Sequence, residues 1–135
     1  MNFMGAHSFN VDKKEVEAVN FFRRASKSGK CPRALNNLAL CFEHGVGDCQ
    51  QDYETALVYY DKAASENYAP AMYNKAFLLF KMAKEQTNQL DSDEYMFESL
   101  HWTRLCLDHC DIIPDAHYMM GYFYEKGIQV SQSLK

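Results

Sequence analysis

The fold is decided by the stretch ALNNLALCFEHGVGDCQQDYETALVYYDKAA, which runs from Ala34 to Ala64. In its first half, Ala34, Leu38 and Phe42 recur every four residues and so fall on one face of a helix. Its second half alternates small and bulky side chains in the same way. We therefore predict two amphipathic helices, joined by the glycine-containing segment that starts at Gly45.

Both halves of this stretch recur along the chain. The first half returns as AMYNKAFLLF from Ala71 and as AHYMMGYFYEKGIQV from Ala116, which are 37 and 45 residues beyond the preceding copy. The second half begins at three small residues, 38 and 43 residues apart: Ala18, Ala56 and Ser99. Because two independent markers share one drifting period, we predict a repeat protein.

Prolines, glycines and one capping aspartate support the boundaries of these repeats. Each proline lies one or two residues before the marker alanine of a first-half helix, where a missing N–H costs nothing: Pro32, Pro70 and Pro114. Glycines that can adopt a left-handed conformation follow these helices at Gly45, Gly47 and Gly127. Asp52 is placed to cap the next helix.

These markers resemble the SEL-one-like repeat, a relative of the tetratricopeptide repeat. Its pattern, A-x-x-x-L-G-x-x-Y-x-x-G-x-G-V followed by D-x-x-x-A-x-x-W-Y-x-K-A-A-x-x-G, is matched at 34–47, 52–64 and 116–127. The chain departs from it at Lys75, where an apolar residue is expected, and in a longer connection over 81–98. The resemblance implies an all-α fold, a right-handed superhelix (solenoid) of antiparallel helical hairpins.

The copies predict a single SEL-one-like array over residues 1–135. It consists of a half repeat (12–30), a repeat (32–67), a repeat with an insertion (69–110) and a half repeat (114–130). Met1 to Phe9 aligns loosely with the end of a missing first-half helix. An array that begins and ends with half a repeat is expected to be a fragment of a longer array, to self-associate through uncapped ends, or to carry an atypical cap. The polar insertion at 81–96 predicts an extended helix or a flexible loop, tolerated or used for binding.

Charge and composition exclude several classes of function. Lys and Arg number 14 against 18 Asp and Glu, so the net charge of −4 argues against nucleic-acid binding. No apolar run reaches the roughly 18 residues of a membrane span, and Met1 to Asn10 lacks the features of a signal peptide. The five cysteines are an odd number, which does not fit a framework of paired disulfides. We expect a soluble, cytoplasmic protein without membrane insertion.

Catalysis leaves no signature in this sequence: phosphate loops, G-x-S-x-G, H-E-x-x-H and C-x-x-C are all missing. We therefore expect no enzyme and no cofactor. Cys106, His109 and Cys110 share a helical face, with His101 one to two turns earlier, and could offer ligands to zinc. However, Cys106 stands where Ala25 and Ala63 stand in other copies, so a structural cysteine is favoured over a metal ligand.

The resemblance implies that the first helices of successive hairpins line a concave face that binds a partner. Asn37 and Asn74, 37 residues apart and in register, could hold the backbone of an extended peptide through their amide groups. The predicted lining is completed by Asn36, Leu40, Tyr73, Phe77, Tyr118 and Tyr122. The alternative is that these side chains only contact the adjacent helix.

We thus expect a non-catalytic adaptor or scaffold that binds a partner peptide or protein on its concave face. The second hypothesis is a regulatory or targeting repeat segment of a larger multidomain protein or enzyme. A third is a metal-binding or redox protein built on Cys106 and Cys110.

Overall fold

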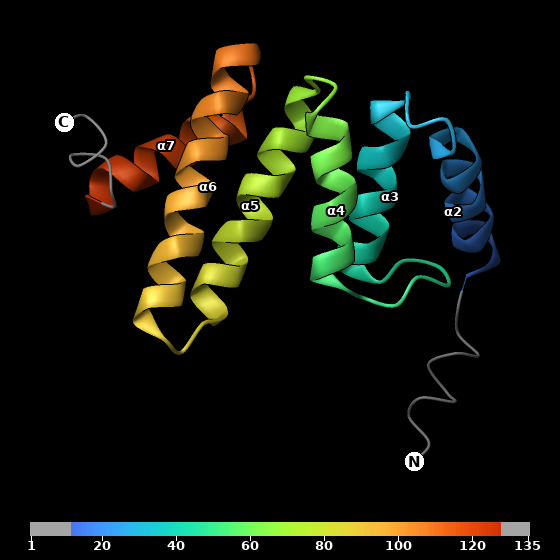
Figure 1. Ribbon diagram of the computed structural model, residues 1–135, viewed down its shortest axis with the longest axis horizontal. Coiled ribbons are helices and arrows are strands. Elements are labelled where there is room, and N and C mark those ends of the chain that lie inside the picture. Colours follow the sequence, from blue (N-terminus) through green and yellow to red (C-terminus); the bar gives the residue numbers. More distant parts are fainter. Residues whose placement is uncertain (1–11, 128–135) are drawn as a thin grey trace. The chain divides into compact units, whose positions relative to one another are not determined.

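A computed structural model describes residues 12–127, which form six α-helices and no strand (Figure 1). The helices are α2 (Lys13–Ser26), α3 (Pro32–His44), α4 (Tyr53–Ala64), α5 (Ala69–Glu85), α6 (Gln89–His109) and α7 (Pro114–Lys126). They group into two compact units, α2–α4 up to Glu66 and α5–α7 from Asn67. The predicted all-α repeat fold is confirmed. The expectations for Met1 to Phe9 and for 128–130 lie outside the described residues.

The predicted helix starts are those that the structure shows. Pro32 and Pro114 are the first residues of α3 and α7, and Pro70 is the second residue of α5. The Asp52 carboxylate accepts hydrogen bonds from the Glu54 and Thr55 N–H groups at 3.1 and 3.4 Å and from the Thr55 hydroxyl at 2.7 Å. These bonds, first of all that of the hydroxyl, lower the pKa of Asp52. Asp52 therefore caps α4 as the sequence predicts.

The turn after α3 needs its glycines for two reasons. Gly45 ends the helix in the left-handed conformation (φ 69°), and its N–H bonds to the Cys41 carbonyl. Gly47 is also left-handed, and a Cβ there would lie 3.1 Å from the backbone oxygen of Glu15 on α2. A larger residue at Gly47 would thus push the turn away from α2.

The core of the first unit combines apolar packing with one buried polar contact. Val19 of α2 and Leu38 of α3 are buried together with two thiols, Cys41 and Cys49. Tyr60 of α4 is fully buried, and its hydroxyl donates a 2.6 Å hydrogen bond to Oε1 of Glu43, which is 3% exposed. Burial, followed by this bond, raises the pKa of Tyr60, so the phenol stays protonated.

The insertion takes the form of two lengthened helices. In Figure 1, α5 and α6 form a long hairpin, and only residues 86–88 separate them. Asn88 caps α6 by accepting from the Leu90 and Asp91 N–H groups at 2.8 and 3.3 Å. Of the two forms predicted for the insertion, the extended helix is the one observed.

The marker positions of α6 lie against α5. Ser99 is fully buried, and its hydroxyl donates to the Ala76 carbonyl at 2.7 Å. Lys75 is half-buried, and its Nζ lies 4.1 Å from the centroid of the Trp102 ring. Trp102 itself is half-buried and does not fill the core as the fully buried Tyr60 does. Its ring instead shields Lys75, the residue that departs from the repeat pattern.

Candidate functional site

A groove of about 320 Å³ lies between α5 and α7 in the second unit. Its α5 side presents residues spaced by four, three and four positions, and its α7 side presents residues three, four and seven positions after Asp115, so each set occupies one helical face. The lining residues are Tyr73, Phe77, Phe80, Lys84, Asp115, Tyr118, Met119 and Tyr122. The two helices are copies of the same half of the repeat. The groove is therefore a product of the repeat itself.

Four of the five aromatic rings of the groove form a continuous layer. On α5, Phe77 stacks with Tyr73 and with Phe80, at centroid distances of 6.1 and 6.4 Å. Phe80 then meets Tyr122 of α7 edge-on at 5.2 Å. Beneath this layer lies the buried cluster that includes Met119 and Phe123. The floor is thus held by core packing, while the upper rings remain accessible.

Two of these rings expose a large fraction of their surface. Phe77 is 39% exposed and Tyr118 is 79% exposed. Exposed apolar surface of this size, next to a concave pocket, is a typical feature of a binding site. The folded chain gains nothing from leaving these rings in water. Their exposure is understandable if a partner covers them.

The groove carries opposite charges at its two ends. Lys84 of α5 places its Nζ 4.9 Å from the Phe80 ring and 5.6 Å from the Tyr122 ring, so it bridges the two helices. Lys126 lies 5.9 Å from the same Tyr122 ring. At the other end Asp115 faces Tyr73, whose pKa is raised by burial and by that carboxylate.

The structure brings half of the predicted contact residues together. Tyr73, Phe77, Tyr118 and Tyr122 all line the groove. Sequence reasoning missed four residues, although each lies three or seven positions from a predicted one and so shares its helical face: Phe80, Lys84, Asp115 and Met119.

The other predicted contact residues are not in this groove. Asn36 is only 6% exposed, so its side chain has almost no surface to offer a partner. Asn37 and Leu40 are half-buried on α3, in the first unit. Asn74 is half-buried on α5 and already has an interaction partner within its own chain. The predicted pairing of Asn37 with Asn74 joins two different units and stays a prediction.

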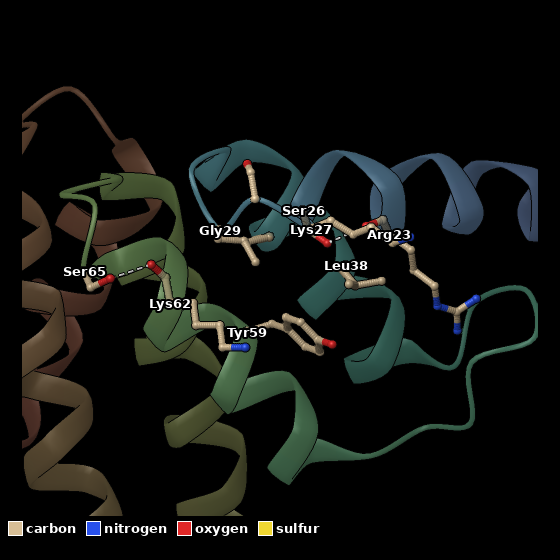
Figure 2. Close-up of a pocket in the computed structure, with 10 residues that line it drawn as sticks. Arg23, Ser26, Lys27, Gly29, Leu38, Tyr59, Lys62 and Ser65 are labelled. Atoms are coloured by element: carbon tan, nitrogen blue, oxygen red, sulfur yellow. Dashed lines mark hydrogen bonds between the residues drawn. The ribbon is translucent and has the colours of Figure 1, made fainter.

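A second, larger pocket of about 570 Å³ lies in the first unit, among α2, α3 and α4 (Figure 2). Three basic residues, three serines and Tyr59 give it a polar rim over a floor of leucines. Its lining residues are Arg23, Ser26, Lys27, Ser28, Gly29, Leu35, Leu38, Tyr59, Lys62 and Ser65. None of them was predicted as a contact residue.

Most of the polar groups in this second pocket are already engaged. Figure 2 shows the Arg23 side chain extending away from Tyr59, and its guanidinium lies 3.4 Å from Asp48. The hydroxyls of Ser26 and Ser65 donate to backbone carbonyls, so their protons are not free for a ligand. The pocket also lies at the ends of α2 and α4, where basic residues offset the helix dipoles. It is therefore the weaker of the two candidates.

The cysteines do not assemble a metal site in the part of the chain that the structure describes. No group of three His, Cys, Asp or Glu side chains is placed to hold a metal ion there. Cys106 is fully buried, and burial raises its pKa to about 11, so it packs as a neutral thiol. Over residues 12–127 we also find no helix long and apolar enough to cross a membrane.

Comparison with known proteins identifies the repeats. The Sel1 repeat model matches residues 1–30, 32–68, 71–88 and 114–135 and leaves out 89–113, which contains α6. The crystal structure of a Sel1 repeat protein from Oxalobacter formigenes is similar, with a TM-score of 0.62 and 28% identity over 83% of this chain. This chain covers 42% of that protein. A search of curated proteins gives no match. The family model covers well over half of the sequence, so the chain belongs to the Sel1 repeat family.

Proposed function

We propose that this protein is a non-catalytic adaptor, which binds a peptide segment of a partner protein in the groove between α5 and α7. The observation that carries the proposal is a groove lined by five aromatic rings from two helices, with Phe77 and Tyr118 left open to solvent. Sel1 repeat proteins are generally protein-interaction modules and generally not catalytic.

The dimensions of the groove favour a peptide over a folded surface. A volume of about 320 Å³ is at the low end for ligand pockets and accommodates a few side chains. Tyr and Phe rings offer a large contact area at little entropic cost, since each has only two side-chain torsions. The hydroxyls of Tyr73, Tyr118 and Tyr122 add polar contacts along the rim. An extended segment that inserts apolar side chains between α5 and α7 would contact the rings and could also form hydrogen bonds with the hydroxyls at the rim.

Asn37 and Asn74 extend this proposal along the face that the family resemblance implies to be concave. Asn37 keeps part of its side chain accessible, and an amide offers both a donor and an acceptor to a peptide backbone. We propose the same role for Asn74 when a partner is bound. Replacing both by Ala should weaken partner binding and leave folding intact. If folding and binding are lost together, these residues belong to the structure alone.

The experiment is an affinity purification from native extract, read by mass spectrometry, with the wild-type chain and two double variants. Phe77→Ala/Tyr118→Ala removes the open rings of the groove. Phe97→Ala/Tyr124→Ala is the matched control, because these two rings are 48% and 55% exposed but do not line the groove. Circular dichroism and size-exclusion chromatography of all three proteins monitor folding and self-association.

We expect the groove variant to lose a defined set of partners that the control variant keeps. Equal partner lists for all three proteins would contradict the proposal. Loss in both double variants together with a change in oligomeric state would instead indicate self-association through exposed apolar surface.

We also propose a cytoplasmic setting for this function, supported by the five cysteines, all of which are free thiols in the structure.

A further inference from the structure

We propose that the peptide bound in the groove carries an acidic side chain, Asp or Glu, at the end of the groove where Lys84 lies. This inference rests on the proposed function, because it specifies the chemistry and the direction of the same ligand. It follows from how Lys84 is held, from the charges around it and from the opposite end of the groove.

Lys84 is positioned without being neutralised. Its ammonium lies within 6 Å of two ring centroids, those of Phe80 and Tyr122, which belong to different helices. Among the described residues it forms no ion pair. The neighbouring carboxylates, Glu85 and Glu125, are exposed and do not pair with it. A lysine held over aromatic rings is pre-organised to meet an anion that enters the groove.

The charges that lie directly against the rings at this end of the groove are positive. Lys84 and Lys126 stand in the last turns of α5 and α7, whose C-termini each contribute about half a negative charge. Two full positive charges exceed these partial charges. A peptide carboxylate is therefore attracted to this end.

The opposite end repels the same group. Asp115 lines the groove beside Tyr73 and is close enough to contribute to the raised pKa of that tyrosine. An acidic peptide residue placed there would face a like charge. The groove thus favours one direction of the bound peptide, with its acidic end at Lys84 and its apolar side chains on the rings.

The anion is a side chain rather than a peptide C-terminus. Proteins usually capture a terminal carboxylate with several backbone N–H groups. At the Lys84 end, α5 and α7 present their C-termini, where the free backbone groups are carbonyls, which accept and cannot donate. A single flexible ammonium is suited to an equally flexible Asp or Glu side chain.

The test is selection of peptides from a random displayed library on the wild-type chain. Affinities of the selected peptides are then measured by fluorescence anisotropy. Each peptide is compared with a version in which its acidic residue is replaced by the matching amide, and with a version that has an amidated C-terminus. The protein variants are Lys84→Gln, Lys84→Glu and, as a control, Lys62→Gln. Lys62 lies 5.2 Å from the Tyr59 ring, outside the groove.

We expect the selected peptides to combine apolar residues with Asp or Glu on one side. Lys84→Gln should weaken them about three- to fivefold, an effect that high salt removes, as for one partly exposed ion pair. Lys84→Glu should weaken the binding of these peptides further. A peptide that carries Lys in place of its acidic residue should bind the Lys84→Glu variant more tightly than the original peptide does. Lys62→Gln should change nothing, and melting curves should show that all variants are folded.

Three outcomes would overturn the inference. If peptides bind through Phe77 and Tyr118 but show no acidic preference and no response at Lys84, the charge inference fails and the proposed function stands. If C-terminal amidation abolishes binding while the side-chain amide does not, the anion is a chain terminus. If no selected peptide depends on Phe77 and Tyr118, the proposed function fails as well.

Discussion

The hydrogen bond between Tyr60 and Glu43 is the most buried polar contact of the first unit, with the two residues 0% and 3% exposed. The phenol donates to the carboxylate, and neither group faces water. We expect Tyr60→Phe to lower the free energy of unfolding by about 1–3 kcal/mol, because a buried acceptor loses a donor. Urea unfolding followed by circular dichroism measures this.

Tyr59→Phe is the control for that prediction. Tyr59 is half-buried, and its hydroxyl has no hydrogen-bond partner within residues 12–127, so its removal should cost less than about 0.5 kcal/mol. If both variants lose equal stability, the buried bond is not a significant contributor. Tyr60→Ala, which also leaves a cavity, should cost about 3–5 kcal/mol.

Two buried thiols predict how stability depends on alkaline pH. Burial is the main cause that raises the pKa of both Cys41 and Cys106 from 9.0 to about 11. A raised pKa in the folded chain means that the stability these thiols contribute is fully present below pH 9 and is lost as pH rises towards 11. Unfolding free energies measured by urea titration should therefore fall across this window.

Replacing the two thiols should flatten that dependence. Cys41→Ala/Cys106→Ala removes both titrating groups, so the loss of stability between pH 9 and 11 should become smaller, whatever the stability at neutral pH. Cys31→Ala, at a half-buried position, is the control. An unchanged pH dependence in the double variant would show that other groups, such as Tyr60, cause the decline.

At the scale of the elements, the start of α6 depends on one side chain. Asn88 satisfies two N–H groups of the first turn, and α6 begins in the stretch where the chain departs from the repeat pattern. Asn88→Ala should therefore cost about 1 kcal/mol, whereas Asn88→Asp should keep the cap. Thermal unfolding measures both, and equal melting temperatures for Asn88→Ala and the wild type would contradict the assignment.

Helix boundaries were predictable because local chemistry determines them. Proline placement, the Asp52 cap and the left-handed Gly45 depend only on neighbouring residues, and the structure confirms each. Whether the insertion forms a helix or a loop could not be decided from the sequence, since a polar stretch suits an exposed helix as well as a loop. The burial of the Trp102 side chain could not be predicted either, because it depends on the contact between Lys75 of α5 and the Trp102 ring of α6.

The same distinction applies to the candidate site. Four aromatic residues of the groove were predicted because the family resemblance assigns them to the concave face of the first helices. Lys84 and Asp115 were missed because their importance comes from α7 lying beside α5, a tertiary fact that periodicity does not contain. Asn36 was predicted as a contact residue because of its helical position, but neighbouring residues cover its side chain in the fold.

At the scale of the whole molecule, the repeats give each unit a similar set of helices but not the same surface. Among residues 12–127 each unit contains three helices, and the open aromatic groove described above belongs to the second. In the first unit, the rings of Phe42 and Tyr59 stack on each other at 5.7 Å and pack against the core. The surface that each unit offers therefore depends on which side chains occupy the repeat positions, and not on the repeat fold as such.

Site-specific photocrosslinking in cells tests whether the groove between α5 and α7 binds a peptide segment. Benzoylphenylalanine is placed at Phe77 in the groove or, as the matched position, at Phe97 on α6, and the crosslinked peptides are sequenced by mass spectrometry. We expect Phe77 to capture one short segment of a partner and Phe97 not to capture it. Capture of the same proteins from both positions, or no segment from Phe77, would contradict this expectation.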